Sequence, residues 1–231
     1  MERAGRLLAS GRDADIFECG PRLILRRSRA AQSMVDEART MVYAREHGYP
    51  VPAIDAISDD GTELTMERLY GPSMVDLLGR RPWMVRGQGV LLADLHRRLH
   101  DIPAPEWVAT APGAAGEQLV HLDLHPLNVM MTAGGPVVID WSNAARGDGH
   151  TDVALTWVLL SAGQIPGGGI KSAVLGRFRS LLTNSFIGQF DLDAVTAHLR
   201  GVVAWKVTDP HMSPIEQQMM WRLVDRVERN R

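Results

Sequence analysis

The sequence predicts an α+β fold with two lobes: a small N-terminal antiparallel sheet with one helix, then a larger, mainly helical lobe. Three observations support this. Short β-type runs separated by turn residues fill the first part of the chain, one helical pattern interrupts them, and helical spacing dominates from about residue 72. The predicted lobes span residues 1–68 and 69–231. With 45% hydrophobic residues, the 231-residue chain can bury a substantial core.

The N-terminal lobe is predicted from its turn residues. Breakers at 10–13 and 20–21 separate short strands, and Leu23–Leu25 is a β-type run. Ser33 followed by Asp36 resembles a helix N-cap, so we expect a helix over about 34–47. Its face is predicted from five residues at helical spacing: Met34, Ala38, Met41, Val42 and Arg45. Two further strands follow between residues 51 and 66, around a turn at 58–61.

The second lobe is predicted to contain helices and one hairpin. Leu91, Leu92, Leu95 and Leu99 repeat along one helical face. Alternating apolar residues on either side of 132–136 predict a hairpin, and helices broken at 165–169 are expected after residue 152.

Net charge and cysteine content limit which partners and which cellular compartment are expected for the chain. A net charge of −2 gives no reason to expect nucleic acid or an anionic membrane as a partner. The single cysteine, Cys19, fits a reducing compartment, and neither a signal peptide nor a membrane anchor is expected, so we predict a cytoplasmic protein. The oligomeric state stays open.

The strongest chemical pattern is the segment 121–128, followed twelve residues after Asn128 by Asp140. Phosphoryl transfer needs a carboxylate that accepts a proton from the acceptor hydroxyl and hard oxygen ligands that hold Mg²⁺. The hairpin between Asn128 and Asp140 would bring these two residues together. We expect Asp123 to be the base, and Asn128 and Asp140 to be the metal ligands.

This pattern resembles the aminoglycoside phosphotransferase and choline kinase family, whose catalytic loop reads His-x-Asp-x-x-x-x-Asn. The resemblance implies a protein-kinase-like fold and Mg²⁺-dependent transfer of the ATP γ-phosphate to a small-molecule hydroxyl. It also places His125 at the catalytic histidine position and Asp152 at an aspartate that braces the loop. By the same resemblance, residues 66–69, with Glu67 and Leu69, would form the hinge that reads the adenine edge.

A cation for the ATP phosphates must come from an arginine, because the only lysines are Lys171 and Lys206. Strand alternation puts Ile24 and Arg26 on one face, so Ile24 can cover the adenine while Arg26 reaches the phosphates. Glu37 is the expected partner of Arg26 and matches the family glutamate. No Gly-x-Gly-x-x-Gly loop is present, and the segment 10–15 with Gly11 would cover the phosphates instead.

The acceptor is expected to be a small molecule, because Asp140 and Asp152 are too close for the peptide-binding segment of protein kinases. Residues 142–231 carry eight acidic and ten basic residues, so a polycationic aminoglycoside does not follow. The acceptor and the choice between ATP and GTP stay open.

Other interpretations are a noncatalytic nucleotide-binding module and a non-haem iron site at His121-x-Asp123, which would need a β-helix and a distal histidine. His96 and His100 are spaced for a shared metal but lack a third ligand nearby in sequence, which favours packing.

Overall fold

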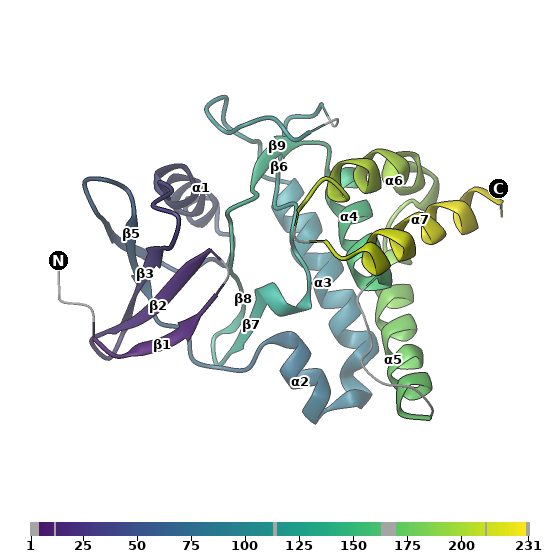
Figure 1. The fold of residues 1–231 in the computed structure, drawn as a ribbon, viewed down its shortest axis with the longest axis horizontal. Helices are drawn as coiled ribbons and strands as arrows, with labels where there is room; N and C mark the ends of the chain where they lie inside the picture. The colour runs from purple at the N-terminus through teal and green to yellow at the C-terminus, as the bar shows by residue number, and fades with distance from the viewer. Residues whose placement is uncertain (1–4, 12, 113–114, 163–169, 211, 230–231) are drawn as a thin grey trace.

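The computed structural model describes residues 5–11, 13–112, 115–162, 170–210 and 212–229, and side chains are described only from 175 onward in the helix that begins at residue 170. Two lobes are visible in Figure 1: a β-sheet with one helix beside it, and a group of helices on the other side of a small hairpin. The predicted break at 165–169 lies outside the described residues. Within these residues, no helix is long and apolar enough to cross a membrane.

The N-terminal sheet has five strands in the order β1-β2-β3-β5-β4, and all neighbours are antiparallel. The strands are β1 (Leu7–Ser10), β2 (Ala14–Cys19), β3 (Leu23–Ser28), β4 (Ile54–Ile57) and β5 (Glu63–Glu67). The central strand β3 pairs with β2 and β5, so Ile24 lies opposite Met66 and Arg26 opposite Leu64. This register fixes the positions of the two residues that were predicted to face the nucleotide.

Helix α1 (Val35–Glu46) forms where the sequence predicts a helix, but two details differ. Met34 occupies the N-cap without a side-chain hydrogen bond, so the prediction of Ser33 as the cap is wrong. Val42 is exposed, whereas Ala38, Met41 and Ala44 are buried. The buried face is therefore set by the residues that pack between the sheet and the second lobe.

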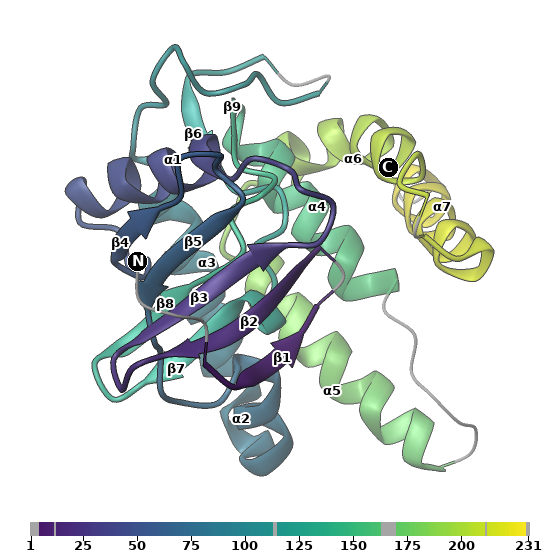
Figure 2. The same ribbon diagram turned by 60° about the vertical axis from the view of Figure 1, so that its left-hand side comes forward.

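The second lobe is mainly helical, as predicted. Figures 1 and 2 show its helices grouped on the side of the β7–β8 hairpin away from the sheet. Leu92, Leu95 and Leu99 are fully buried on the face of the helix that was predicted from their spacing. The helices are α2 (Met74–Arg80), α3 (Val85–His100), α4 (Gly149–Ala162), α5 (Ile170–Ile187), α6 (Leu192–Lys206) and α7 (Pro214–Arg229), with a 3₁₀ turn at Pro82–Met84.

The predicted hairpin is present as β7 (Val129–Thr132) and β8 (Gly135–Val138), preceded by a 3₁₀ turn at Pro126–Asn128. A second small sheet, β6 (Gln118–Val120) paired with β9 (Ala145–Gly147), was not predicted. This pair is not a hairpin, so the expected single hairpin is the one that β7 and β8 form; the three-residue strands β6 and β9 pair over a long sequence distance and carry no local turn signal. The β6–β9 pair brackets the catalytic loop, since β6 ends just before His121.

The chain crosses between the lobes beside the β7–β8 hairpin. Met131 donates its backbone N–H to the Pro72 carbonyl at 2.8 Å, and Ser73 bridges to Met130. Gly71 has φ +153°, and a Cβ built on it would lie 2.1 Å from the Met131 carbonyl oxygen. Glycine is therefore required where the crossover touches the hairpin.

Candidate active site

The predicted catalytic loop brings Asp123 and Asn128 into direct contact. The Asn128 side-chain amide donates hydrogen bonds to the Asp123 backbone carbonyl at 2.9 Å and to the Asp123 carboxylate Oδ2 at 3.0 Å. His125 Nε2 lies 3.6 Å from the other carboxylate oxygen, Oδ1. The Asp123 carboxylate is thus oriented from both sides and remains partly accessible, as proton acceptance from a bound substrate requires.

Two backbone positions around this loop are strained. Leu122 has φ +56° and Asp140 has φ +63°, in the left-handed region that disfavours a branched side chain such as leucine. Leu122 is also almost completely buried. A conformation of this kind persists only where surrounding interactions hold it.

Asp152, in the first turn of α4, supplies those interactions. Its carboxylate accepts hydrogen bonds from the backbone N–H groups of His121 at 3.0 Å and Leu122 at 2.8 Å. His100 Nε2 lies 3.1 Å from the same carboxylate. Complete burial opposes the charged form, yet hydrogen bonds from His100 and His121 and the nearby imidazoles lower the pKa of Asp152 below its usual range. The structure thus places Asp152 as the brace that the resemblance implied.

His96 and His100 each contact groups of the protein interior. His96 is fully buried, with its ring nitrogens 2.9 Å from the Leu92 carbonyl oxygen and 3.0 Å from Thr156 Oγ1. The Thr156 hydroxyl donates in turn to the Leu124 carbonyl at 2.8 Å, so this chain reaches the catalytic loop. Burial lowers the pKa of His96 to about 4. The packing interpretation of this histidine pair is consistent with these contacts.

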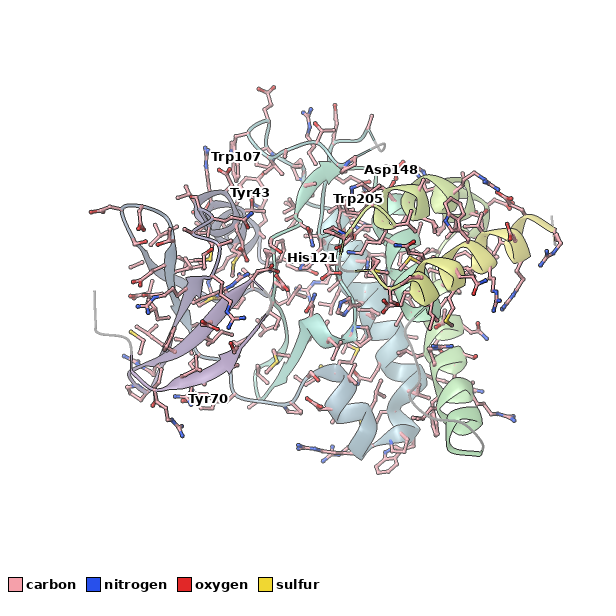
Figure 3. All side chains as sticks on the ribbon, viewed as in Figure 1. Tyr43, Tyr70, Trp107, His121, Asp148 and Trp205 are labelled. Atoms are coloured by element: carbon pink, nitrogen blue, oxygen red, sulfur yellow. The ribbon has the colours of Figure 1, made fainter. Side chains whose placement is uncertain are left out.

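His121 lies between the two lobes, with the sheet on one side and the helices on the other, as its label in Figure 3 shows. It is fully buried, its ring packs on Trp141 at 5.0 Å between centroids, and its Nε2 lies 3.2 Å from the Ile139 carbonyl. Its Nδ1 is buried without a hydrogen-bond partner among the described residues. The His121 side chain is therefore part of the protein interior. An iron site at His121-x-Asp123 would also need a β-helix, and the lobe around His121 is mainly helical.

Arg26, predicted to bind the ATP phosphates, contacts its predicted partner Glu37. Arg26 on β3 forms a short ion pair with Glu37 on α1. The Nη2 atom of Arg26 also lies 3.7 Å from Asp140 Oδ1. Burial raises the pKa of Glu37, and the Arg26 guanidinium opposes that shift. One arginine thus links the sheet, α1 and the residue predicted to bind metal.

The other residues predicted to hold the nucleotide lie on β3, at or just after the end of β5, and in the connection between β1 and β2. Ile24 is half-buried beside Arg26, and Leu69 is half-buried after β5. The Glu67 carboxylate accepts a hydrogen bond from the Ala53 backbone N–H at 3.0 Å, so its side chain is committed to the sheet edge. Gly11 donates its N–H to the Ala14 carbonyl at 2.9 Å within the β1–β2 connection. None of these contacts tests the predicted nucleotide roles, which remain predictions.

Lys206, at the end of α6, is a nearby charge that the sequence pattern missed. Its side chain is mostly buried, and its ammonium lies 3.3 Å from Asp209. Burial lowers the pKa of His125, the Asp123 charge opposes that shift, and Lys206 adds to the lowering. Lys206 is one of only two lysines in the sequence, and this rarity could have drawn attention to it. Its electrostatic effect on His125, however, depends on where α6 packs in the folded chain.

A cavity of about 620 Å³ lies elsewhere, among α4, α5, α6 and α7. Its walls include Trp157, Arg179, Asp193, Arg222 and Arg226, and none of the predicted catalytic residues. This cavity is therefore separate from the Asp123 site, and its arginines do not suit a polycation.

The architecture is that of the kinase-like fold, with a sheet lobe and a helical lobe meeting at the loop that carries Asp123. Residues 87–180 match the sequence model of the phosphotransferase enzyme family, APH. That segment contains the catalytic loop, Asp140 and Asp152. The resemblance predicted from the sequence is confirmed. No curated protein sequence gives a significant match to the chain.

Solved structures of similar fold include aminoglycoside phosphotransferases. The ADP-bound APH(2'')-Ib is 14% identical with a TM-score of 0.64, covering 93% of this chain and 91% of its own. A thermostable mutant of APH(4)-Ia is 16% identical with a TM-score of 0.63, covering 95% and 93%. A choline/ethanolamine kinase family protein from Mesorhizobium loti is 15% identical with a TM-score of 0.55, covering 99% and 81%. At these identities the similarity establishes the fold, and the predicted protein-kinase-like architecture is confirmed.

Proposed function

We propose that the protein is an ATP-dependent phosphotransferase that moves the γ-phosphate to a hydroxyl group of a small molecule. The observation that carries the proposal is the 3.7 Å approach of Arg26 to Asp140. It places the only arginine of β3 that is held by a buried carboxylate next to the predicted metal ligand, at the boundary between the lobes. In a phosphoryl-transfer site, the cationic side chain that binds the ATP phosphates lies near the residue that binds the metal ion.

In this proposal Asp123 accepts the proton of the acceptor hydroxyl. Its Oδ2 atom receives the Asn128 amide, which fixes the carboxylate, while its other oxygen stays near His125. Because the pKa of His125 is lowered, its imidazole is mainly neutral at pH 7 and adds no positive charge that would weaken Asp123 as a base.

Arg26 would hold phosphate oxygens, anchored by Glu37. Because the Glu37 side chain is largely buried, its ion pair holds the guanidinium through Nη1, while Nη2 lies on the side of Asp140. Phosphoryl transfer gains most from such fixed positive charge, because the transition state carries charge on its equatorial oxygens.

The residues fit Mg²⁺ by the chemistry of their donors. Asp140 has an exposed carboxylate that receives only a 3.1 Å hydrogen bond from Ser142 and the longer contact from Arg26. The Asn128 amide nitrogen is used by Asp123, which leaves its oxygen to act as a ligand. When bound, the ion would neutralise charge on the phosphates.

The acceptor is proposed to be a neutral or weakly charged small molecule with a free hydroxyl. Lys206 near His125, and the balance of charges after residue 142, do not build an acidic pocket for a polycation. The connection from Asp140 to α4 includes only β9, which leaves no long segment to hold a peptide.

The proposal is tested by incubating the purified chain with Mg²⁺, ATP or GTP, and a panel of sugars, aminoalcohols and hydroxyl-bearing antibiotics. We expect ADP release and a phosphorylated product, found by mass spectrometry, for at least one acceptor, and no product with Asp123→Asn. Binding of ATP without transfer to any acceptor, in wild type as in the variant, would favour a noncatalytic nucleotide-binding module instead.

A further inference from the structure

Two histidines and an aspartate converge at the start of α4, away from the residues assigned to phosphoryl transfer. His150 Nδ1 lies 2.9 Å from Asp148 Oδ1, and His198 Nε2 on α6 lies 3.5 Å from Asp148 Oδ2. One donor atom from each residue lies within 4.8 Å of the others. Figure 3 labels Asp148 beside α6, the helix that carries His198.

The spacing of these atoms suits a divalent transition metal. Ligand atoms about 2.0–2.1 Å from a tetrahedral Zn²⁺ lie about 3.4 Å from one another. His198 Nε2 lies at about this separation, 3.5 Å, from Asp148 Oδ2, and His150 Nδ1 is at hydrogen-bond distance, 2.9 Å, from the other carboxylate oxygen, Oδ1. One donor atom from each of the three residues therefore lies within the range that a single ion can draw together. The imidazole rings of His150 and His198 are nearly parallel, at 14°, and both turn a nitrogen toward the same carboxylate.

The surroundings prepare the donors for binding. Thr151 Oγ1 lies 2.9 Å from His198 Nδ1, so the Nδ1–H can donate to this buried hydroxyl and leave the Nε2 lone pair facing Asp148. All three side chains are partly accessible, so an ion can enter from solvent.

We propose that Asp148, His150 and His198 form a binding site for a divalent transition-metal ion, with Zn²⁺ the best match, and that a water completes the coordination. Two imidazoles and one carboxylate prefer Zn²⁺ and its neighbours in the first transition series over Mg²⁺, which favours oxygen ligands alone. The site is distinct from the Asn128 and Asp140 pair proposed to bind Mg²⁺.

The ion would join α6 to the beginning of α4. His198 precedes Lys206 by about two helical turns on α6, and Asp148 precedes the loop-bracing Asp152 by four residues. A metal at this point would therefore fix the helix that carries Lys206 relative to the helix that holds the catalytic loop. The proposed role is structural, and it does not depend on phosphotransfer.

Calorimetric titration of untagged protein with ZnCl₂, in excess MgCl₂ so that oxygen-only sites are occupied, tests the proposal. We expect one Zn²⁺ per chain, and affinity at least about 100-fold weaker in His198→Ala and in His150→Ala, because each loses one ligand. His47→Ala is the matched control, since His47 is an exposed histidine at the end of α1, and it should bind as wild type does.

A second measurement identifies the ligands directly. Co²⁺ bound to the wild type should give visible absorption bands of a nitrogen- and oxygen-ligated ion, and the bands should disappear in His198→Ala while circular dichroism shows the same helix content. The proposal is overturned if wild type binds no stoichiometric Zn²⁺ at micromolar concentrations, or if both histidine variants bind Zn²⁺ and Co²⁺ as wild type does.

Discussion

The Arg26 guanidinium on strand β3 lies 3.7 Å from the Asp140 carboxylate after strand β8, so a cation of one lobe faces an anion of the other. Glu37 pairs with the other terminal nitrogen of the guanidinium, Nη1. One arginine is thus shared between two carboxylates, one on α1 and one after β8.

Coupling between Arg26 and Glu37 gives the first prediction. Arg26→Ala and Glu37→Ala should each weaken ATP use by about tenfold or more, and the double variant should lose less than the sum, because each change removes the same anchored cation. Arg26→Lys should retain only part of the activity, since lysine keeps the charge but loses the planar fork.

Steady-state kinetics with varied ATP measure these losses. Arg27→Ala is the control, because Arg27 pairs with Glu63 at 2.7 Å near the surface of the same strand, and loss of such a pair has little effect. Additive losses for Arg26 and Glu37 would count against a coupled pair, and an unchanged KM for ATP in Arg26→Ala, Arg26→Lys and Glu37→Ala would show that Arg26 does not hold the ATP phosphates.

The assignment of Asp123 as the base gives the second prediction. Asp123→Asn should reduce turnover by about 100-fold or more while ATP affinity and the melting temperature change little, because the amide cannot accept the hydroxyl proton. The control is Asp94→Asn, at an exposed carboxylate 3.6 Å from Arg97 on α3. Turnover near the wild-type value in Asp123→Asn would assign the base elsewhere.

The third prediction concerns acid stability through His96. Its folded-state pKa of about 4 is below its usual 6.5, so between these values the unfolded chain binds the extra proton and stability falls as pH falls. His96 should therefore contribute a loss of about 3 kcal/mol in the free energy of unfolding between pH 6.5 and 4. Above pH 6.5 this contribution is constant.

Urea denaturation at several pH values measures this effect. His96→Gln should flatten the curve of stability against pH in that window, whereas the exposed His47→Gln should follow the wild-type curve. Parallel curves for wild type and His96→Gln would show that His96 does not stay neutral in the interior.

The crossover between the lobes gives the fourth prediction. Gly71→Ala should lower the free energy of unfolding by about 3 kcal/mol, because the new methyl group would collide with the Met131 carbonyl. Gly79→Ala is the matched control: this helical glycine has open space around it and should gain up to about 1 kcal/mol. If the two variants are equally stable, the backbone at residue 71 can move away from the Met131 carbonyl without a cost in free energy.

Two contacts expected from the sequence, Asp123 with Asn128 and Arg26 with Glu37, are present because short stretches of chain determine them. Asp123, Asn128 and Asp140 are placed by one loop and one hairpin, so their spacing in the chain determines their spacing in the fold. Arg26 follows from strand alternation and from the lack of an earlier lysine. The pairing of Arg26 with Glu37 is then a short-range consequence of β3 leading into α1.

The missed features depend on contacts between distant segments. His198 reaches Asp148, and Lys206 acts electrostatically on His125, because α6 packs against α4. The pairing of β6 with β9 has the same long-range origin. Ser33 carries a strong capping signal, yet the helix begins one residue later than that cap requires, because tertiary packing decides where α1 starts.

The most direct test of the central claim does not require the acceptor. Calorimetric titration of ATP into wild type and Asp140→Ala, each with and without Mg²⁺, measures whether Asp140 links the metal to the nucleotide. We expect Mg²⁺ to tighten ATP binding by about tenfold or more in wild type and to leave it unchanged in Asp140→Ala, because one hard oxygen ligand and its charge are lost. An equal effect of Mg²⁺ in both proteins, or no ATP binding by wild type, would contradict it.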